Sequence, residues 1–147
     1  MYKHLLVPVD GSALAERAMK VSIDFAKQLG ASITGFIAEP LPPLSPSPRS
    51  GALHEADENE RDAPSGVYAQ EVLSRFEALA RAAGVPFKGY HDHVARVDRA
   101  IIAAAESQGC DIIVMVTHGR GAFGEFLYGS QTKAVLAGSK LPLLVLH

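Results

Sequence analysis

Short apolar runs separated by helical patterns divide the chain into alternating strands and helices. Strands are expected at 4–9, 32–38, 87–94, 111–116 and 141–146. The first of these, 4–9, is almost wholly apolar, as is typical of a parallel strand covered on both faces. Between them, apolar residues recur at three- and four-residue spacing, which predicts amphipathic helices. These helical patterns fall at 15–29, 72–83, 98–108 and 130–139. The order predicts an α/β fold, an open doubly wound parallel sheet with helices on both faces.

Residues at the ends of the helical patterns support these boundaries. Glycine readily adopts the left-handed conformation that ends a helix, and Gly30, Gly84 and Gly109 each follow a helical pattern. Serine and aspartate are good N-cap residues. We therefore expect Ser12 to cap the first helix and Asp98 to cap the third.

The segment 39–65 differs in composition from the rest of the chain. It begins with a proline-rich stretch and continues with an acidic one. A connection of this length inside a compact domain is either functional or disordered. We favour a flexible flap over a plain disordered insertion. The chain of 147 residues has the size of one domain, so residues 1–147 are expected to form a single unit.

Composition and charge exclude several classes of function. The net charge of −2 gives no support for nucleic-acid binding. No apolar run approaches the roughly 20 residues that span a bilayer, so no membrane association is expected. No apolar leader follows Met1, and the chain is expected to be cytoplasmic. Cys110 is the only cysteine, and at the start of a strand it is expected to be a small buried hydrophobe.

A glycine-rich loop follows the apolar run 111–116 and leads into the last helical pattern. It contains Gly119, Gly121 and Gly124, and Gly129-Ser130 opens the helix. Glycine lets the backbone approach a ligand, and the N–H groups of a helix start favour an anion. The stretch therefore predicts a cradle for nucleotide phosphates. His118 lies in this cradle, where it either neighbours a phosphate or shapes the turn.

A second candidate segment, Pro8-Val9-Asp10, follows the first strand. In doubly wound sheets the ligand lies beyond the carboxyl ends of strands, where the strand order reverses. If the first and fourth strands are neighbours, both segments edge one crevice. Asp10 would then accept a hydrogen bond from ribose or adenine.

Other chemistry receives less support from the residues. The stretch 119–124 matches G-x-G-x-x-G, but no acidic residue follows at the spacing that a dinucleotide site needs, and the P-loop lysine is absent. His91 and His93 share one face of a strand, yet two ligands do not complete a metal site. The sequence contains no credible catalytic constellation, so we assign no catalytic residue and no metal ligand.

Several motifs in this order resemble the universal stress protein family, whose fold is Rossmann-like and similar to the adenine nucleotide alpha hydrolases. They are LLVPVDGS, DIIVMVTHGRG, Gly129-Ser130 and PLLVLH. The ATP-binding branch of that family carries G-2x-G-9x-G-(S/T), which Gly119 and Gly129-Ser130 match. Val116 replaces the first glycine, and Ala95-Arg96-Val97 stands where the family often has Gly-Asp-Pro.

The resemblance implies a sheet order of 3-2-1-4-5 and a homodimer formed through residues 142–147. It implies binding of ATP, or of AMP or ADP, with Mg²⁺ accompanying the nucleotide, and a role as a stress-response switch with at most slow ATP hydrolysis. With the segments above, the expected nucleotide-binding residues are Pro8, Val9, Asp10, Ile37, Val116, His118, Gly119, Arg120, Gly121, Gly129, Ser130 and Gln131.

Two other functions stay open. Because Val116 departs from the motif, the alternative is a nucleotide-free dimeric scaffold for protein partners. A third is an enzyme of nucleotidyl transfer or hydrolysis, although no general base is evident.

Overall fold

A computed structural model describes residues 1–11, 15–41, 65–116 and 130–146. Strands and helices alternate through these residues as predicted. The elements are β1 (His4–Pro8), α1 (Ala15–Leu29), β2 (Ser32–Pro40), α3 (Ser65–Ala82), β3 (Phe87–Val94), α4 (Val97–Ser107), β4 (Ile112–Val116), α6 (Ser130–Gly138) and β5 (Leu143–Leu146). The described strands form one five-stranded parallel sheet of order β3-β2-β1-β4-β5. The predicted fold class and strand order are therefore confirmed.

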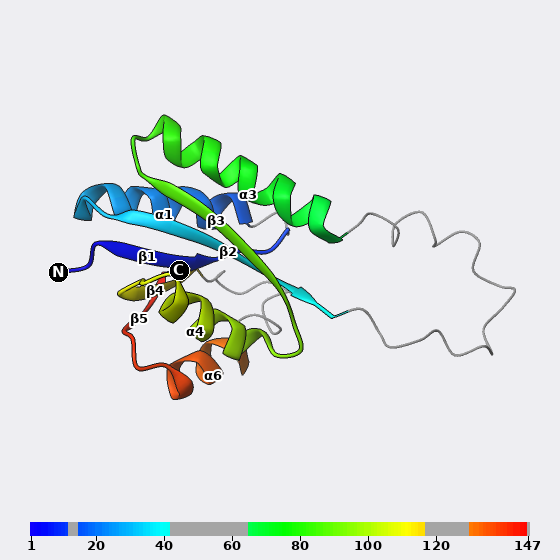
Figure 1. Ribbon diagram of the computed structural model, residues 1–147. Helices are drawn as coiled ribbons and strands as arrows, with labels where there is room; N and C mark the ends of the chain where they lie inside the picture. The colour runs from blue at the N-terminus through cyan, green and yellow to red at the C-terminus, as the bar shows by residue number, and fades with distance from the viewer. Residues whose placement is uncertain (12–14, 42–64, 117–129, 147) are drawn as a thin grey trace, which may run out of the picture.

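Helices cover both faces of the sheet, with α1 and α3 on one side and α4 and α6 on the other (Figure 1). The central strand β1 is apolar throughout its middle because it is covered from both sides. Leu5 and Val7 pack with the α1 and α3 layer, and Leu6 packs with the α4 layer. All three are fully buried, and burial of each such side chain contributes about 1.5–3 kcal/mol.

The two edges of the sheet differ in polarity. The outer strand β3 exposes polar side chains, among them Lys88, His91, Asp92 and His93. The opposite outer strand, β5, is the apolar sequence LLVL. One edge therefore presents charged and polar groups to solvent, and the other presents an apolar strand.

The pairing of β1 with β4 joins distant parts of the chain. Leu5 lies opposite Ile112, and Leu6 lies opposite Ile113. At the amino ends of these strands, the Asp111 carboxylate accepts hydrogen bonds from the backbone N–H groups of Lys3 (2.9 Å) and His4 (3.1 Å). The carboxyl ends of β1 and β4 consequently lie side by side at the other end of these strands, which we call the carboxyl edge of the sheet.

Glycines end the helices as the sequence predicts. Gly30, Gly84 and Gly109 have φ angles of 64°, 75° and 68°, in the left-handed region where a side chain would be strained. The predicted cap of α4 is wrong, because Arg96 occupies the N-cap position and makes no side-chain cap hydrogen bond. Asp98 lies in the first turn, where its carboxylate pairs with the Arg96 guanidinium at 2.8 Å. Ser12 lies outside the described residues.

Strand β2 is longer than predicted and continues through Glu39 to Pro40. Pairing with β3 explains the extension, since Pro40 still lies opposite Val94. The first residues of the predicted flap therefore belong to the sheet, and α3 already begins at Ser65. Residues 42–64 lie outside the described part of the chain, so the flap stays a prediction.

Cys110 is a small buried hydrophobe, as expected. It precedes β4 and is 6% exposed within the layer that contains Ile101 and Ile113. Burial raises the pKa of its thiol to about 11, because the apolar surroundings disfavour the thiolate.

The close packing above Gly35 makes a specific prediction about stability. A Cβ at this position of β2 would lie 2.7 Å from Phe87 and 2.8 Å from Phe76, whose ring centroids are 4.7 Å apart. Gly35→Ala should therefore force this aromatic pair apart and lower the free energy of unfolding by about 1–3 kcal/mol. Urea denaturation monitored by circular dichroism measures the loss.

Gly89→Ala in β3 is the matched control, because its added Cβ would lie 3.3 Å from the Leu73 side chain. That substitution should cost less than Gly35→Ala. Equal losses for the two variants would contradict the packing account.

Candidate functional site

The candidate site lies where β1 and β4 end beside each other. Pro8 is the last residue of β1 and lies opposite Phe36 of β2. The backbone N–H of Val9 donates a hydrogen bond to the Phe36 carbonyl oxygen at 2.8 Å, so β1 stays attached to β2 for one residue beyond its end. Asp10 follows and is partly exposed. The structure thus holds Pro8, Val9 and Asp10 at the carboxyl edge of the sheet.

Two other candidate residues belong largely to the core. Ile37 is 4% exposed and packs in the layer between the sheet and the helices α1 and α3. Val116 ends β4, is partly buried, and packs against the same layer. Both residues therefore have a packing role at the edge, and their contact with a ligand stays a prediction.

The described start of α6 agrees with the predicted helix opening. Ser130 is its first residue, and Gln131 in the first turn is partly exposed. The loop between β4 and α6, with His118, Gly119, Arg120, Gly121 and Gly129, lies outside the described residues. The structure therefore describes the end of β4 and the start of α6, which flank the predicted phosphate cradle. The cradle itself stays a prediction.

A buried carboxylate near this edge was missed by the sequence analysis. The side chain of Glu39 is 5% exposed, and its Oε2 lies 3.1 Å from Nδ1 of His93. That distance allows an ion pair when the histidine is protonated. However, neither carboxylate oxygen accepts a hydrogen bond among the described residues. The sequence carries no signal for this contact, because it depends on the register that places Glu39 opposite His93.

The two histidines of β3 lie opposite different residues of β2. His91 lies opposite Ile37, and His93 lies opposite Glu39. Among the residues that the structure describes, no three histidine, cysteine, aspartate or glutamate side chains are arranged to hold a metal ion.

The connection from β3 to α4 also ends at the carboxyl edge. Arg96 donates to both oxygens of the Asp98 carboxylate, from Nε at 3.3 Å and from Nη2 at 2.8 Å. This hydrogen bonding is the main reason that the pKa of Asp98 lies below its usual value, and partial burial opposes the shift. This side-chain pair thus lies in the connection between β3 and α4, where Ala95-Arg96-Val97 replaces the Gly-Asp-Pro pattern.

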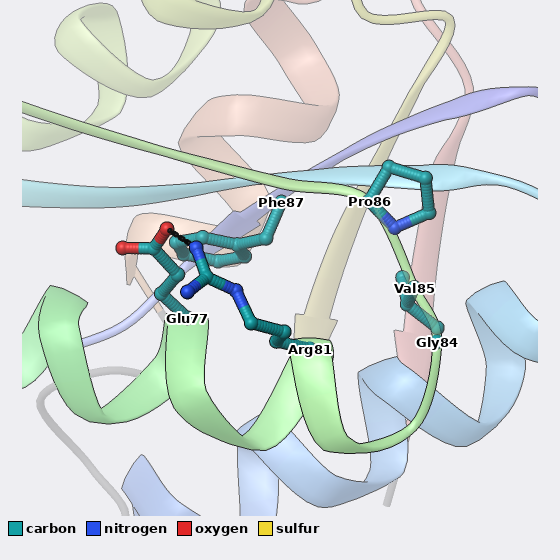
Figure 2. Close-up of a pocket in the computed structure, with 6 residues that line it drawn as sticks. All are labelled: Glu77, Arg81, Gly84, Val85, Pro86 and Phe87. Atoms are coloured by element: carbon teal, nitrogen blue, oxygen red, sulfur yellow. Dashed lines mark hydrogen bonds and ion pairs between the residues drawn. The ribbon is translucent and has the colours of Figure 1, made fainter.

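An open pocket occurs at the amino end of β3, away from the carboxyl ends of the strands where the candidate site lies. Figure 2 shows its lining by the end of α3, the turn at Gly84 and the start of β3. The ion pair between Arg81 and Glu77, at 2.8 Å, lies along one wall. Because this pocket is at the amino end of β3, it is not the crevice where a doubly wound sheet binds its ligand.

The arrangement defines a class of protein, the open doubly wound α/β domains whose ligands bind at a reversal of strand order. Here the reversal falls between β1 and β4. The model of the universal stress protein family matches residues 1–147, and the chain belongs to this family.

Individual relatives agree with this assignment. A universal stress protein of Thermus aquaticus is 33% identical over 148 residues, covering 100% of both chains. A universal stress protein of Methanocaldococcus jannaschii is 27% identical over 146 residues, covering 99% of this chain and 82% of the relative. Among solved structures, a family protein of Burkholderia pseudomallei has a TM-score of 0.74 at 22% identity, covering 99% and 96% of the two chains.

Two structures of the same fold were solved with adenine nucleotides. A universal stress protein of Archaeoglobus fulgidus was determined with dAMP, with a TM-score of 0.64, 20% identity and coverage of 99% and 98%. A family protein of Arabidopsis thaliana was determined with AMP, with a TM-score of 0.65, 12% identity and coverage of 98% and 90%. At these identities the likeness concerns the fold.

A helix that crosses a bilayer must be long and apolar along most of its length. Within residues 1–11, 15–41, 65–116 and 130–146, no helix is long and apolar enough to cross a membrane.

The Arg96–Asp98 pair predicts a pH dependence. Because hydrogen bonding by Arg96 lowers the pKa of Asp98, the pair stabilises the fold above the ordinary aspartate pKa. This contribution is lost as the pH falls through the lowered value. Arg96→Ala should raise the pKa of Asp98 and remove part of this acid-range dependence. Carboxyl chemical shifts followed by NMR titration measure the change, with Arg99→Ala in the same helix as the control. An unchanged pKa in Arg96→Ala would show that the guanidinium does not set it.

Proposed function

We propose that the protein binds ATP or a related adenine nucleotide at the carboxyl edge of β1 and β4, and that the bound nucleotide acts as a stress-response switch. The observation that supports this proposal most strongly is the reversal of strand order between these two strands. At such a reversal the flanking helices go to opposite faces, so the connections diverge and leave a crevice.

The residues at this edge suit the parts of a nucleotide. The Asp10 carboxylate is an acceptor for ribose hydroxyl or adenine amino groups. The start of α6 provides backbone N–H groups for a phosphate, after a loop that carries the glycines of the ATP-binding motif. The related structures with AMP and dAMP support the choice of an adenine nucleotide.

Magnesium fits this site as a companion of the phosphates. No cluster of three metal-binding side chains occurs among the described residues. Magnesium commonly binds through one or two carboxylates together with substrate phosphates. Asp10 is one carboxylate at this edge, so we propose that the nucleotide phosphates, water and Asp10 together coordinate the ion.

A second candidate is the nucleotide-free dimeric scaffold. The observation in its favour is Val116, which replaces the first glycine of the motif and packs against the core layer. A branched side chain fixed at the end of β4 reduces the space available to a ligand there. Nucleotide titration distinguishes the two functions directly.

The first test is isothermal titration of nucleotide-stripped protein with ATP and Mg²⁺, with AMP and NAD in parallel. Saturable binding of ATP or AMP is expected. Asp10→Ala should weaken it roughly tenfold or more, because a hydrogen bond to a charged group contributes about 1.5–3 kcal/mol.

Asp24→Ala removes the same charge from an exposed position near the far end of α1, and it should bind as the native protein does. Heat traces without saturation for every nucleotide would refute the proposal and favour the scaffold.

We also propose that the functional unit is a cytoplasmic homodimer joined through the last strand. The sheet order ends at β5, and an apolar outer strand favours pairing with another strand. The Pro142 carbonyl oxygen accepts from the Ile113 N–H at 3.0 Å. Backbone groups alternate in direction along a strand, so those of Val145 point away from β4.

Val145→Pro should therefore remove an outward donor, weaken the dimer and leave the β4–β5 ladder intact. Light scattering after size exclusion measures the mass, and circular dichroism verifies the fold. A monomeric native protein, or a variant that dimerises equally well, would contradict this interface.

A further inference from the structure

Tyr68 is an aromatic residue that the core of the protein does not use. The buried residues of α3 include Ala69, Leu73, Phe76 and Ala80, which recur at helical spacing along one stripe. Tyr68 precedes the first of these and lies off the stripe, with 46% of its surface exposed.

The ring of Tyr68 nevertheless reaches a second element. Its Oη and Cζ atoms occupy the space in which a Cβ of Gly11 would stand. Gly11 directly follows Asp10, so the phenol lies against the connection that leaves the carboxyl end of β1. A side chain at position 11 would therefore meet the Tyr68 ring.

The position of α3 fixes where this ring lies. Ala69 and Phe76 are fully buried, and α3 packs against α1, β2 and β3. The first turn of α3 is thereby held beside the edge where β1 and β2 end. A half-exposed aromatic ring is therefore held at that edge, beside the connection that begins with Asp10.

We propose that Tyr68 forms a wall of the nucleotide site, where its ring stacks on the base and increases the affinity for purines over pyrimidines. This inference depends on the proposed nucleotide binding and names a residue that determines specificity within the same site. Aromatic rings stack on any base, and the larger face of a purine gains more contact area.

The test measures the dissociation constants of ATP and of CTP in the presence of Mg²⁺. It compares the native protein with Tyr68→Ala and Tyr68→Phe. Tyr68→Ala should weaken ATP binding about tenfold and CTP binding less, so the preference for the purine falls. Tyr68→Phe retains the ring and should remain within about twofold of the native affinity. Because Tyr68 is half exposed, the urea midpoint of each variant should match that of the native protein.

Fluorescence provides an independent readout, since the chain contains no tryptophan. Tyr68→Trp should give an emission signal that changes on addition of ATP. Tyr2→Trp, at the amino-terminal edge of the sheet, is the control and should not respond. Gly11→Ala should displace the phenol and lower ATP affinity in the same direction as Tyr68→Ala.

The outcomes separate this inference from the proposed function. If the native protein binds ATP and Tyr68→Ala binds it with the same affinity and the same purine preference, the role of Tyr68 is overturned. Nucleotide binding itself would then still stand. An equal loss for ATP and CTP would indicate a structural role and also overturn it. If neither the native protein nor Tyr68→Ala binds nucleotide, both proposals fail. Binding by Tyr68→Ala alone would show that the ring blocks the site, which contradicts stacking.

Discussion

The ladder between β1 and β4 is the contact on which the rest of the structure depends. It pairs the beginning of the chain with a strand more than a hundred residues later, Leu5 with Ile112, and the Asp111 carboxylate holds its amino end. With β2 on its other side, β1 becomes the central strand and must be apolar on both faces. The same pairing sends α1 and α6 to opposite layers (Figure 1). The crevice at the carboxyl edge is therefore a geometric consequence of the way the core is closed.

Features of the fold that depend on local chemistry could be predicted from the sequence. The place of β4 follows from the apolar run 111–116. The helix ends at Gly30, Gly84 and Gly109 follow from the left-handed conformation that glycine tolerates. Features that depend on pairing could not. Glu39 is charged and precedes a proline, which indicates a loop, yet pairing with β3 keeps it in the sheet. Aspartate is a common N-cap residue, but the Asp98 carboxylate instead accepts hydrogen bonds from the Arg96 guanidinium.

The candidate site shows the same division. The sequence identified Pro8, Val9 and Asp10 because they end an apolar run, and the structure places them at the expected edge. Ile37 and Val116 were expected at a ligand, and the structure shows Ile37 buried in the core and Val116 packed against it. Tyr68 had no signal of its own, since the helical pattern was evident only from Val72 onward. Its proximity to Gly11 arises from the packing of α3 on the sheet, which a one-dimensional pattern does not contain.

The different polarity of the two sheet edges limits how far copies of the chain can associate. Polymerisation by strand addition needs two adhesive edges on each molecule, so that every added copy offers a new end. Here β3 exposes Lys88, Asp92 and two histidines, and charged groups on an outer strand oppose pairing. Only the apolar edge at β5 remains. When two copies pair through the same strand, the contact is isologous, and neither copy has an apolar outer strand left for a third. In the proposed dimer, growth would therefore stop at two copies, and the parallel sheet would not extend into a fibre.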